Sequence, residues 1–140
     1  MNNRFKFRVW LPDENRFMDN RFDNPIIDGN GNLMWSYLTP FAHWEHRPME
    51  NAIIEQCTGL TDKNGKLIYE GDVFEATVLN SFDGDHLIEK RIRGQVSFFT
   101  DAASFAFAAY SPCNLGELEI IGNIHDNQFR DLTKKVEGQE

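Results

Sequence analysis

Apolar and polar residues alternate along much of the chain, which is the period of half-buried β-strands. In the first such segment, residues 4–11, the apolar face consists of Phe5, Phe7, Val9 and Leu11. Turn-forming residues then break the pattern at 12–15, and residues 16–18 predict a short partner strand. The amino-terminal segment therefore predicts a pair of strands.

Two further turns predict hairpins. Asp28-Gly29-Asn30-Gly31 separates the apolar pairs at 26–27 and 33–34, and Asn64-Gly65 follows a strand-like segment at 53–57. Asn and Gly both tolerate positive φ, so Asn64-Gly65 is the strongest hairpin signal in the chain. We expect Gly71 to turn the chain into the next strand.

Beyond Gly71 the alternation predicts four consecutive short strands, centred on residues 74–78, 92–98, 105–109 and 118–124. Loops are expected at 81–85 and 111–114. Gly94 and Gly122 lie inside two of these strands, where a missing side chain allows strong curvature. The order favours a small, bent barrel followed by a short helix at 128–136, which Asp126 and Asn127 could cap.

One stretch, residues 35–51, follows neither the strand nor the helix period and contains Pro40 and Pro48. We expect an ordered loop with at most one turn of helix. Trp, Tyr and Arg dominate the energies of protein interfaces, so this loop is the predicted partner surface. Its candidate residues are Trp35, Tyr37, Phe41, Trp44 and Arg47. A hydrophobic lid over the core and a homo-oligomer contact are the alternatives.

The amino-acid composition limits the class of protein and the kinds of partner. With 140 residues, 41% of them hydrophobic and 26% charged, the chain is an ordinary globular protein. Its net charge of −8 disfavours nucleic acid and anionic membranes as partners. No apolar run approaches the ~20 residues of a membrane span, and the amino terminus lacks the apolar core of a signal peptide. Cys57 and Cys113 are expected to be reduced thiols, so we expect a cytoplasmic protein.

The residues that could carry chemistry have simpler structural explanations. The Gly- and Asp-rich stretch 58–74 matches neither glycine-rich phosphate-binding motif, and 62–65 lacks the fixed acids of a calcium loop. His43 and His46 lack the spacing of paired zinc ligands, and no third ligand is evident. We therefore expect no metal, no cofactor and no catalytic residues, and we read the stretch 58–74 as turn chemistry.

Several segments in order carry a family resemblance. They are FRVWLPDENRFM at 7–18, EQCTGLTDKNGKLIYEGDVF at 55–74, GQVSFF at 94–99 and LEIIGNIHDN at 118–127. Together they resemble the YopX family of bacteriophage and prophage proteins. The resemblance implies a phage or prophage origin and a β-rich fold with an SH3-like barrel in the carboxy-terminal half. It brings no established activity and no catalytic residues.

The sequence thus predicts a mainly β protein with an amino-terminal β region at 1–57, which contains the aromatic loop, and an SH3-like barrel region with the terminal helix at 58–140, as one compact unit. The functional hypothesis is a non-catalytic module that binds a host or phage protein. Two alternatives remain open. One is an acidic decoy that mimics DNA to block a host nucleic-acid-binding protein, and the other is an enzyme whose site is assembled across strands.

Overall fold

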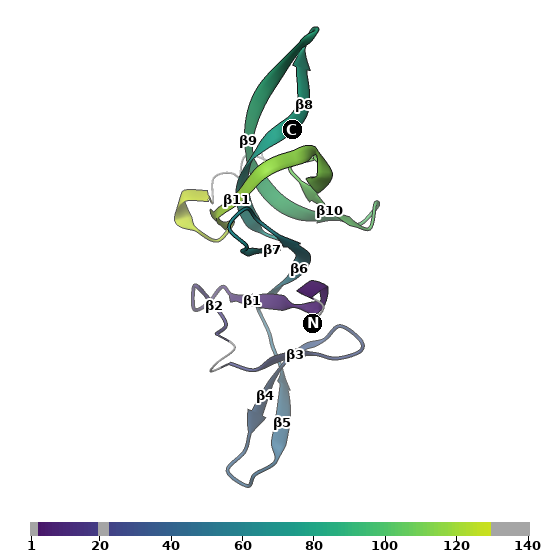
Figure 1. Cartoon of the computed structure of the whole chain (residues 1–140). Helices are drawn as coiled ribbons and strands as arrows, with labels where there is room; N and C mark the ends of the chain where they lie inside the picture. Colours follow the sequence, from purple (N-terminus) through teal and green to yellow (C-terminus); the bar gives the residue numbers. More distant parts are fainter. Residues whose placement is uncertain (1–2, 20–22, 130–140) are drawn as a thin grey trace, which may run out of the picture. The chain divides into compact units, whose positions relative to one another are not determined.

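The computed structural model describes residues 3–19 and 23–129 (Figure 1). Strands make up 59% of these residues and helical turns 7%, so the expected mainly β class is confirmed. The chain divides into two units, one comprising Phe7–Gln56 and the other Met1–Lys6 together with Cys57–Glu140. Strand β6 begins in the first unit and ends in the second.

The unit Phe7–Gln56 is built from short antiparallel strands. They are β1 (Phe7–Leu11), β2 (Arg16–Phe17), β3 (Pro25–Ile27), β4 (Leu33–Leu38), β5 (Trp44–Pro48) and the start of β6 (Ile53–Thr61). Strand β1 pairs with β2 on one side and with β6 on the other, and β3, β4 and β5 form a three-stranded sheet in that order. The small core of this unit contains Val9, Leu11 and Met18.

The amino-terminal strand is shorter than the alternation predicts. The prediction that β2 pairs with it is confirmed, and Val9 and Leu11 are buried. However, Phe5 lies in the helical turn η1 (Asn3–Phe5) and is 74% exposed. The Lys6 N–H donates a hydrogen bond to the carbonyl oxygen of Asn3, which closes the turn before the strand can begin. Including Phe5 in the strand was therefore wrong.

The expected loop at 35–51 is also wrong, because most of it forms the β4–β5 hairpin. Trp35 pairs with Arg47 and Tyr37 with Glu45 in a regular antiparallel register. Pro48 fits because it lies at the edge of the sheet between hydrogen-bonded pairs, where its missing N–H would point away from β4. All five residues of β5 are exposed, so neither face imposes the apolar alternation by which strands are recognised.

The second unit contains the larger core. Its strands are the end of β6, β7 (Leu67–Tyr69), β8 (Asp72–Asp83), β9 (His86–Phe99), β10 (Ser104–Phe107) and β11 (Leu115–Asn123), and its helical turns are η1, η2 (Pro112–Asn114) and η3 (Asn127–Phe129). Strands β10, β9, β8 and β11 form one sheet in that order, which curls into a half-barrel. Phe74 and Phe107 pack edge to face at its centre, with ring centroids 5.5 Å apart.

Two glycines in this sheet lie where the surrounding residues leave no room for a side chain. A Cβ on Gly94 would collide with the side chain of Ala108, and one on Gly122 would lie 2.5 Å from both Asp126 and the ring of Phe129. Strand β11 also shifts register twice against β8, and such irregularities increase local bending. The prediction that these positions need a missing side chain is confirmed.

The loop expected at 81–85 is instead part of a long hairpin. Strands β8 and β9 continue as a pair to Asp83 and His86, and only Gly84 and Asp85 form the turn. The pairing of β11 ends at Val78, so residues 79–88 extend beyond the neighbouring strand (Figure 1). We call residues 79–88 the β8–β9 arm. Exposure on both of its sides again hides the strand pattern.

The Gly- and Asp-rich stretch is organised by the buried carboxylate of Asp62. Its Oδ1 accepts the N–H groups of Asn64 and Lys66, both at 2.9 Å, and its Oδ2 accepts that of Ile120 at 3.0 Å. Gly65 closes the turn between β6 and β7 with a φ of 81°. The structure thus uses this stretch to turn the chain and to join β7 to β11.

Only the beginning of the expected terminal helix lies within the described residues. Asn127–Phe129 form the helical turn η3, and the rest of the predicted segment at 128–136 lies outside the described residues. Within the part of the chain that the structure describes, no helix is long and apolar enough to cross a membrane.

Gly71 offers a direct test of the corner between β7 and β8. Its φ is 86°, its N–H donates to Val96 and its carbonyl oxygen accepts from Ile124, both at 2.8 Å. A β-branched residue is strained at this φ, so Gly71→Val should lower the free energy of unfolding by about 1–3 kcal/mol. Gly29→Val is the matched control, because nothing lies within 4 Å of its added Cβ. Equal unfolding midpoints for the two variants would contradict the claim that the corner between β7 and β8 requires a glycine.

Asp62 should make stability depend on pH. Burial favours a higher pKa for its carboxyl, but the hydrogen bonds from Ile120, Lys66 and Asn64 outweigh burial, and the pKa lies below its usual 3.8. A lowered pKa means that the carboxylate stabilises the fold above pH 3.8 and loses this effect as the pH falls through the lowered value.

In Asp62→Asn, an N–H₂ group replaces the acceptor of the Ile120 N–H. This variant should lose about 1–3 kcal/mol of stability at neutral pH, because a buried donor is left without its partner. The difference from the parent should shrink in acid. Denaturant unfolding of both proteins across pH would show this, with the exposed Asp101→Asn as control. A difference independent of pH would contradict the role of the charge.

Candidate functional site

The β4–β5 hairpin separates the predicted partner residues into three groups. Because paired residues share a face of an antiparallel sheet, Trp35, Tyr37 and Arg47 lie on one face. Trp44 lies on the opposite face, paired with Leu38, and Phe41 lies in the connecting turn. The structure therefore brings together three of the five residues and presents the other two on different sides of the same hairpin.

Cross-strand contacts order the first face. The hydroxyl of Tyr37 donates a 2.6 Å hydrogen bond to Glu45, and the guanidinium of Arg47 lies 5.6 Å from the centre of the Tyr37 ring. The hydrogen bond to the carboxylate raises the pKa of Tyr37 and lowers that of Glu45. His43 Nε2 also lies 3.2 Å from Glu45. These contacts hold aromatic and charged groups in place without burying them.

The second face and the turn are strongly exposed. Trp44 is 58% exposed and Phe41 86% exposed. The Thr39 N–H donates to the carbonyl oxygen of His43 and closes the turn, in which Ala42 has a φ of 60°. The turn is thus a defined structure that presents a phenylalanine to solvent. Neither side chain is buried within the unit Phe7–Gln56.

A hollow of about 260 Å³ lies beside the first face, within the same unit. Trp35 and Arg47 form one wall, Asp13 and Glu14 from the β1–β2 turn form another, and residues 48–51 complete it. We call it the Trp35 hollow. Leu11 contributes apolar surface, so the hollow combines an aromatic wall with carboxylates.

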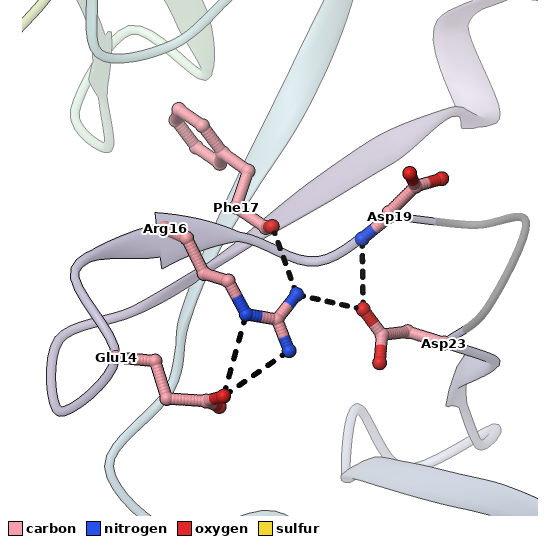
Figure 2. Close-up of polar contacts among 5 residues, drawn as sticks. All are labelled: Glu14, Arg16, Phe17, Asp19 and Asp23. Carbon is pink, nitrogen blue, oxygen red and sulfur yellow. Dashed lines mark hydrogen bonds and ion pairs between the residues drawn. The ribbon is translucent and has the colours of Figure 1, made fainter.

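A network around Arg16 holds one of these carboxylates (Figure 2). Arg16 donates to Glu14 Oε1 from Nε at 3.3 Å and from Nη2 at 3.2 Å, and its Nη1 lies 3.0 Å from Asp23. The Asp19 N–H donates to the same Asp23 carboxylate at 2.8 Å. The hydrogen bond from Arg16 lowers the pKa of Asp23. Glu14 is therefore positioned by a cation that it shares with a second acid.

A second hydrogen bond fixes the neighbouring carboxylate, that of Asp13. The side-chain N–H₂ of Asn51 donates to Asp13 at 2.8 Å. Both Asn15 and Asn51 have φ near 50°, a conformation that asparagine tolerates better than most residues. Turn chemistry thus places both Asp13 and Glu14 at the hollow.

The geometry does not assemble a metal site from the histidines. His43 follows the turn and contacts Glu45, whereas His46 pairs with Ser36 on the other face of the hairpin. No group of three His, Cys, Asp or Glu side chains within residues 3–19 and 23–129 is arranged to hold a metal ion.

The two cysteines do not form a nucleophilic site with the described groups. Cys57 is fully buried and Cys113 is exposed, and both are free thiols. Cys113 lies 3.1 Å from the hydroxyl of Ser111 and borders a hollow of about 550 Å³ together with Asp62. Asp62 already accepts three backbone N–H groups, so it is committed to structure.

Sequence reasoning missed two exposed features. The β8–β9 arm presents Phe82, 61% exposed, opposite Leu87 on the same face. The acidic wall of the Trp35 hollow was also missed, because it brings Asp13 and Glu14 close to Glu50, far away in sequence. No local motif signals such an arrangement. The β4–β5 hairpin remains the better candidate site, since it alone of the two hairpins carries Trp, Tyr and Arg together with a hollow.

The chain is similar to a known family and to solved structures. Residues 6–129 match the family model described as YopX protein. The crystal structure of protein EF1440 from Enterococcus faecalis is 22% identical, with 88% of this chain and 94% of that chain covered and a TM-score of 0.50. The X-ray structure of YopX from Bacillus subtilis is 16% identical, with 91% and 97% covered and a TM-score of 0.47. None of the curated proteins matches. At 22% identity, the likeness to EF1440 concerns the fold alone.

Truncating an exposed aromatic side chain of the hairpin should leave the fold intact. Trp44→Ala should change the free energy of unfolding by less than about 1 kcal/mol, because little buried area is lost. The buried Phe74→Ala, in contrast, should cost about 3–5 kcal/mol. Denaturant unfolding of both variants tests this difference. A cost of several kcal/mol for Trp44→Ala would show that the hairpin belongs to a core.

Proposed function

The chain belongs to the YopX family, and we propose that it is a phage- or prophage-encoded protein that acts by binding a host or phage protein, without catalysis. The β4–β5 hairpin is the binding surface in this proposal. We place the protein in the host cytoplasm, because its two cysteines are free thiols and thiols stay reduced in that compartment. The half-barrel of β8 to β11 supports the expected SH3-like barrel, which remains a prediction.

The observation that carries this proposal is the exposure of aromatic side chains on an ordered hairpin. Trp35 is 42% exposed on one face, Trp44 is exposed on the other, and Phe41 lies at the turn. Burying such side chains against a partner removes apolar area from water at about 25 cal/mol per Å². Tryptophan, tyrosine and arginine are also the residues that most often dominate interface energies.

Order in the free protein favours binding as well. The strands of the hairpin are paired from Met34–Pro48 to Leu38–Trp44, and Tyr37 is hydrogen-bonded to Glu45. These contacts restrict the conformation of the hairpin before a partner binds. A preorganised surface loses less conformational entropy on association. The partner would gain an aromatic, partly charged surface of fixed shape, which suits a specific complex.

A second copy of this chain is an alternative occupant of the same surface. The acidic-decoy and enzyme alternatives lack a specific observation in their favour. Glu75 is paired with Arg93 and Arg91, and Glu119 with Lys63, so carboxylates on this sheet are interleaved with bases. A DNA mimic would instead present acids in an uninterrupted array.

Affinity capture with matched variants tests the proposal. The parent and Phe41→Ala would be used to capture proteins from a lysate of the bacterium whose genome carries the gene, with Phe82→Ala as the control for loss of an exposed phenylalanine. We expect one specific protein with the parent and with Phe82→Ala, and at least a tenfold loss, about 1.4 kcal/mol, with Phe41→Ala. Sedimentation analysis of the parent distinguishes self-association.

Loss of capture with Phe82→Ala and not with Phe41→Ala would contradict the assignment and move the surface to the β8–β9 arm. Conversion of a substrate by the purified protein, abolished by a point substitution that leaves the fold intact, would contradict the non-catalytic role.

A further inference from the structure

We propose that the Trp35 hollow receives one positively charged side chain, arginine or lysine, from the protein that the hairpin binds. This inference rests on the proposed function, because it names the chemistry of the partner at one point of that surface. It concerns only residues of the unit Phe7–Gln56.

The size of the hollow suits a single side chain. Its volume of about 260 Å³ lies below the ~300–1,000 Å³ of pockets that enclose whole small molecules. Leu11 and Met49 supply apolar surface for an aliphatic stem, and Trp35 supplies an aromatic wall. Long cationic side chains bury such stems while their charged ends stay among polar groups.

The charge of the hollow selects a cation. Three carboxylates line it, those of Asp13, Glu14 and Glu50, against one base, Arg47. The charge of Arg47 is opposed by Glu45, whose pKa it helps to lower. Arg16 is shared by Glu14 and Asp23, so this trio retains a net negative charge. An anionic or neutral side chain would not offset the remaining negative charge.

The geometry is also prepared for recognition. Asn51 holds Asp13, and Arg16 holds Glu14, so two carboxylates keep their positions without a ligand. Glu50 makes no hydrogen bond or ion pair with the described residues and can turn towards an incoming cation. A cation over the face of an indole ring is attracted by the negative potential of that face, and carboxylates provide charge-assisted hydrogen bonds in addition.

The test uses the folded chain and small probes. N-acetyl-arginine amide is titrated into the protein, and the indole N–H signals of its three tryptophans are followed by NMR. N-acetyl-citrulline amide is the control, because it has nearly the shape of arginine without the charge. We expect arginine amide to bind in the millimolar range, ~4 kcal/mol, and to shift the signal of Trp35 but not that of Trp44, which lies on the other face. Lysine amide acetylated at its α-amino group, which keeps the side-chain ammonium, should shift the same signal.

Variants connect the shift to the carboxylates. Glu50→Gln should weaken arginine amide binding about two- to fivefold, the range of one exposed charge pair, whereas Glu89→Gln on the β8–β9 hairpin should leave it unchanged. Equal shifts with citrulline, no shift of Trp35 with arginine, or an unchanged affinity in Glu50→Gln would overturn the inference.

These outcomes separate the inference from the proposed function. If Phe41→Ala abolishes capture of a partner while arginine and citrulline behave alike, the hairpin is the binding surface and only the cation preference is wrong. If arginine binds selectively and capture is indifferent to the hairpin variants, the proposed binding surface is wrong, and with it the inference that the cation comes from a protein bound there.

Discussion

The carboxylate of Asp62 is the interaction on which the half-barrel depends. It accepts N–H groups from the β6–β7 turn and from Ile120 in β11, so one side chain joins two segments that are far apart in sequence. The adjacent Lys63 N–H donates to the carbonyl oxygen of Leu118 and adds a second link. These bonds keep β7 and β11 over the core around Phe74. A stretch that resembles a ligand-binding loop in composition is therefore structural.

The hydrophobic core of the unit Phe7–Gln56 is small and leaves the β4–β5 hairpin exposed. The β4–β5 hairpin is held by backbone pairing and by cross-strand contacts such as Tyr37–Glu45, and the described residues of its unit do not bury Trp44 or Phe41. Exposed apolar surface that forms a contiguous patch often marks an interaction site. In this account, the fold is maintained by turns and buried carboxylates, and recognition is left to the hairpin.

The sequence predicted the turns and corners of the chain but not which side chains are exposed. The turn at Gly65, the corner at Gly71 and the close approach at Gly94 each require a glycine, so the glycine itself indicates the local backbone conformation. The β4–β5 hairpin was not predicted because the alternation that identifies a strand requires one buried face. Pro48 also argued against a strand, although proline is tolerated at the edge of a sheet, where Pro48 lies. The Trp35 hollow escaped because the contact of 13–14 with residue 50 is made only by folding.

Site-specific photo-crosslinking would test the central claim most directly. A benzophenone amino acid would replace Phe41 in one protein, Phe82 in a second and the exposed Asn30 of the β3–β4 turn in a third. After irradiation in cells that express the protein from its own gene, we expect one discrete adduct from position 41 and none of the same mass from positions 82 and 30. The absence of an adduct from position 41, or the same adduct from all three positions, would contradict binding through the β4–β5 hairpin.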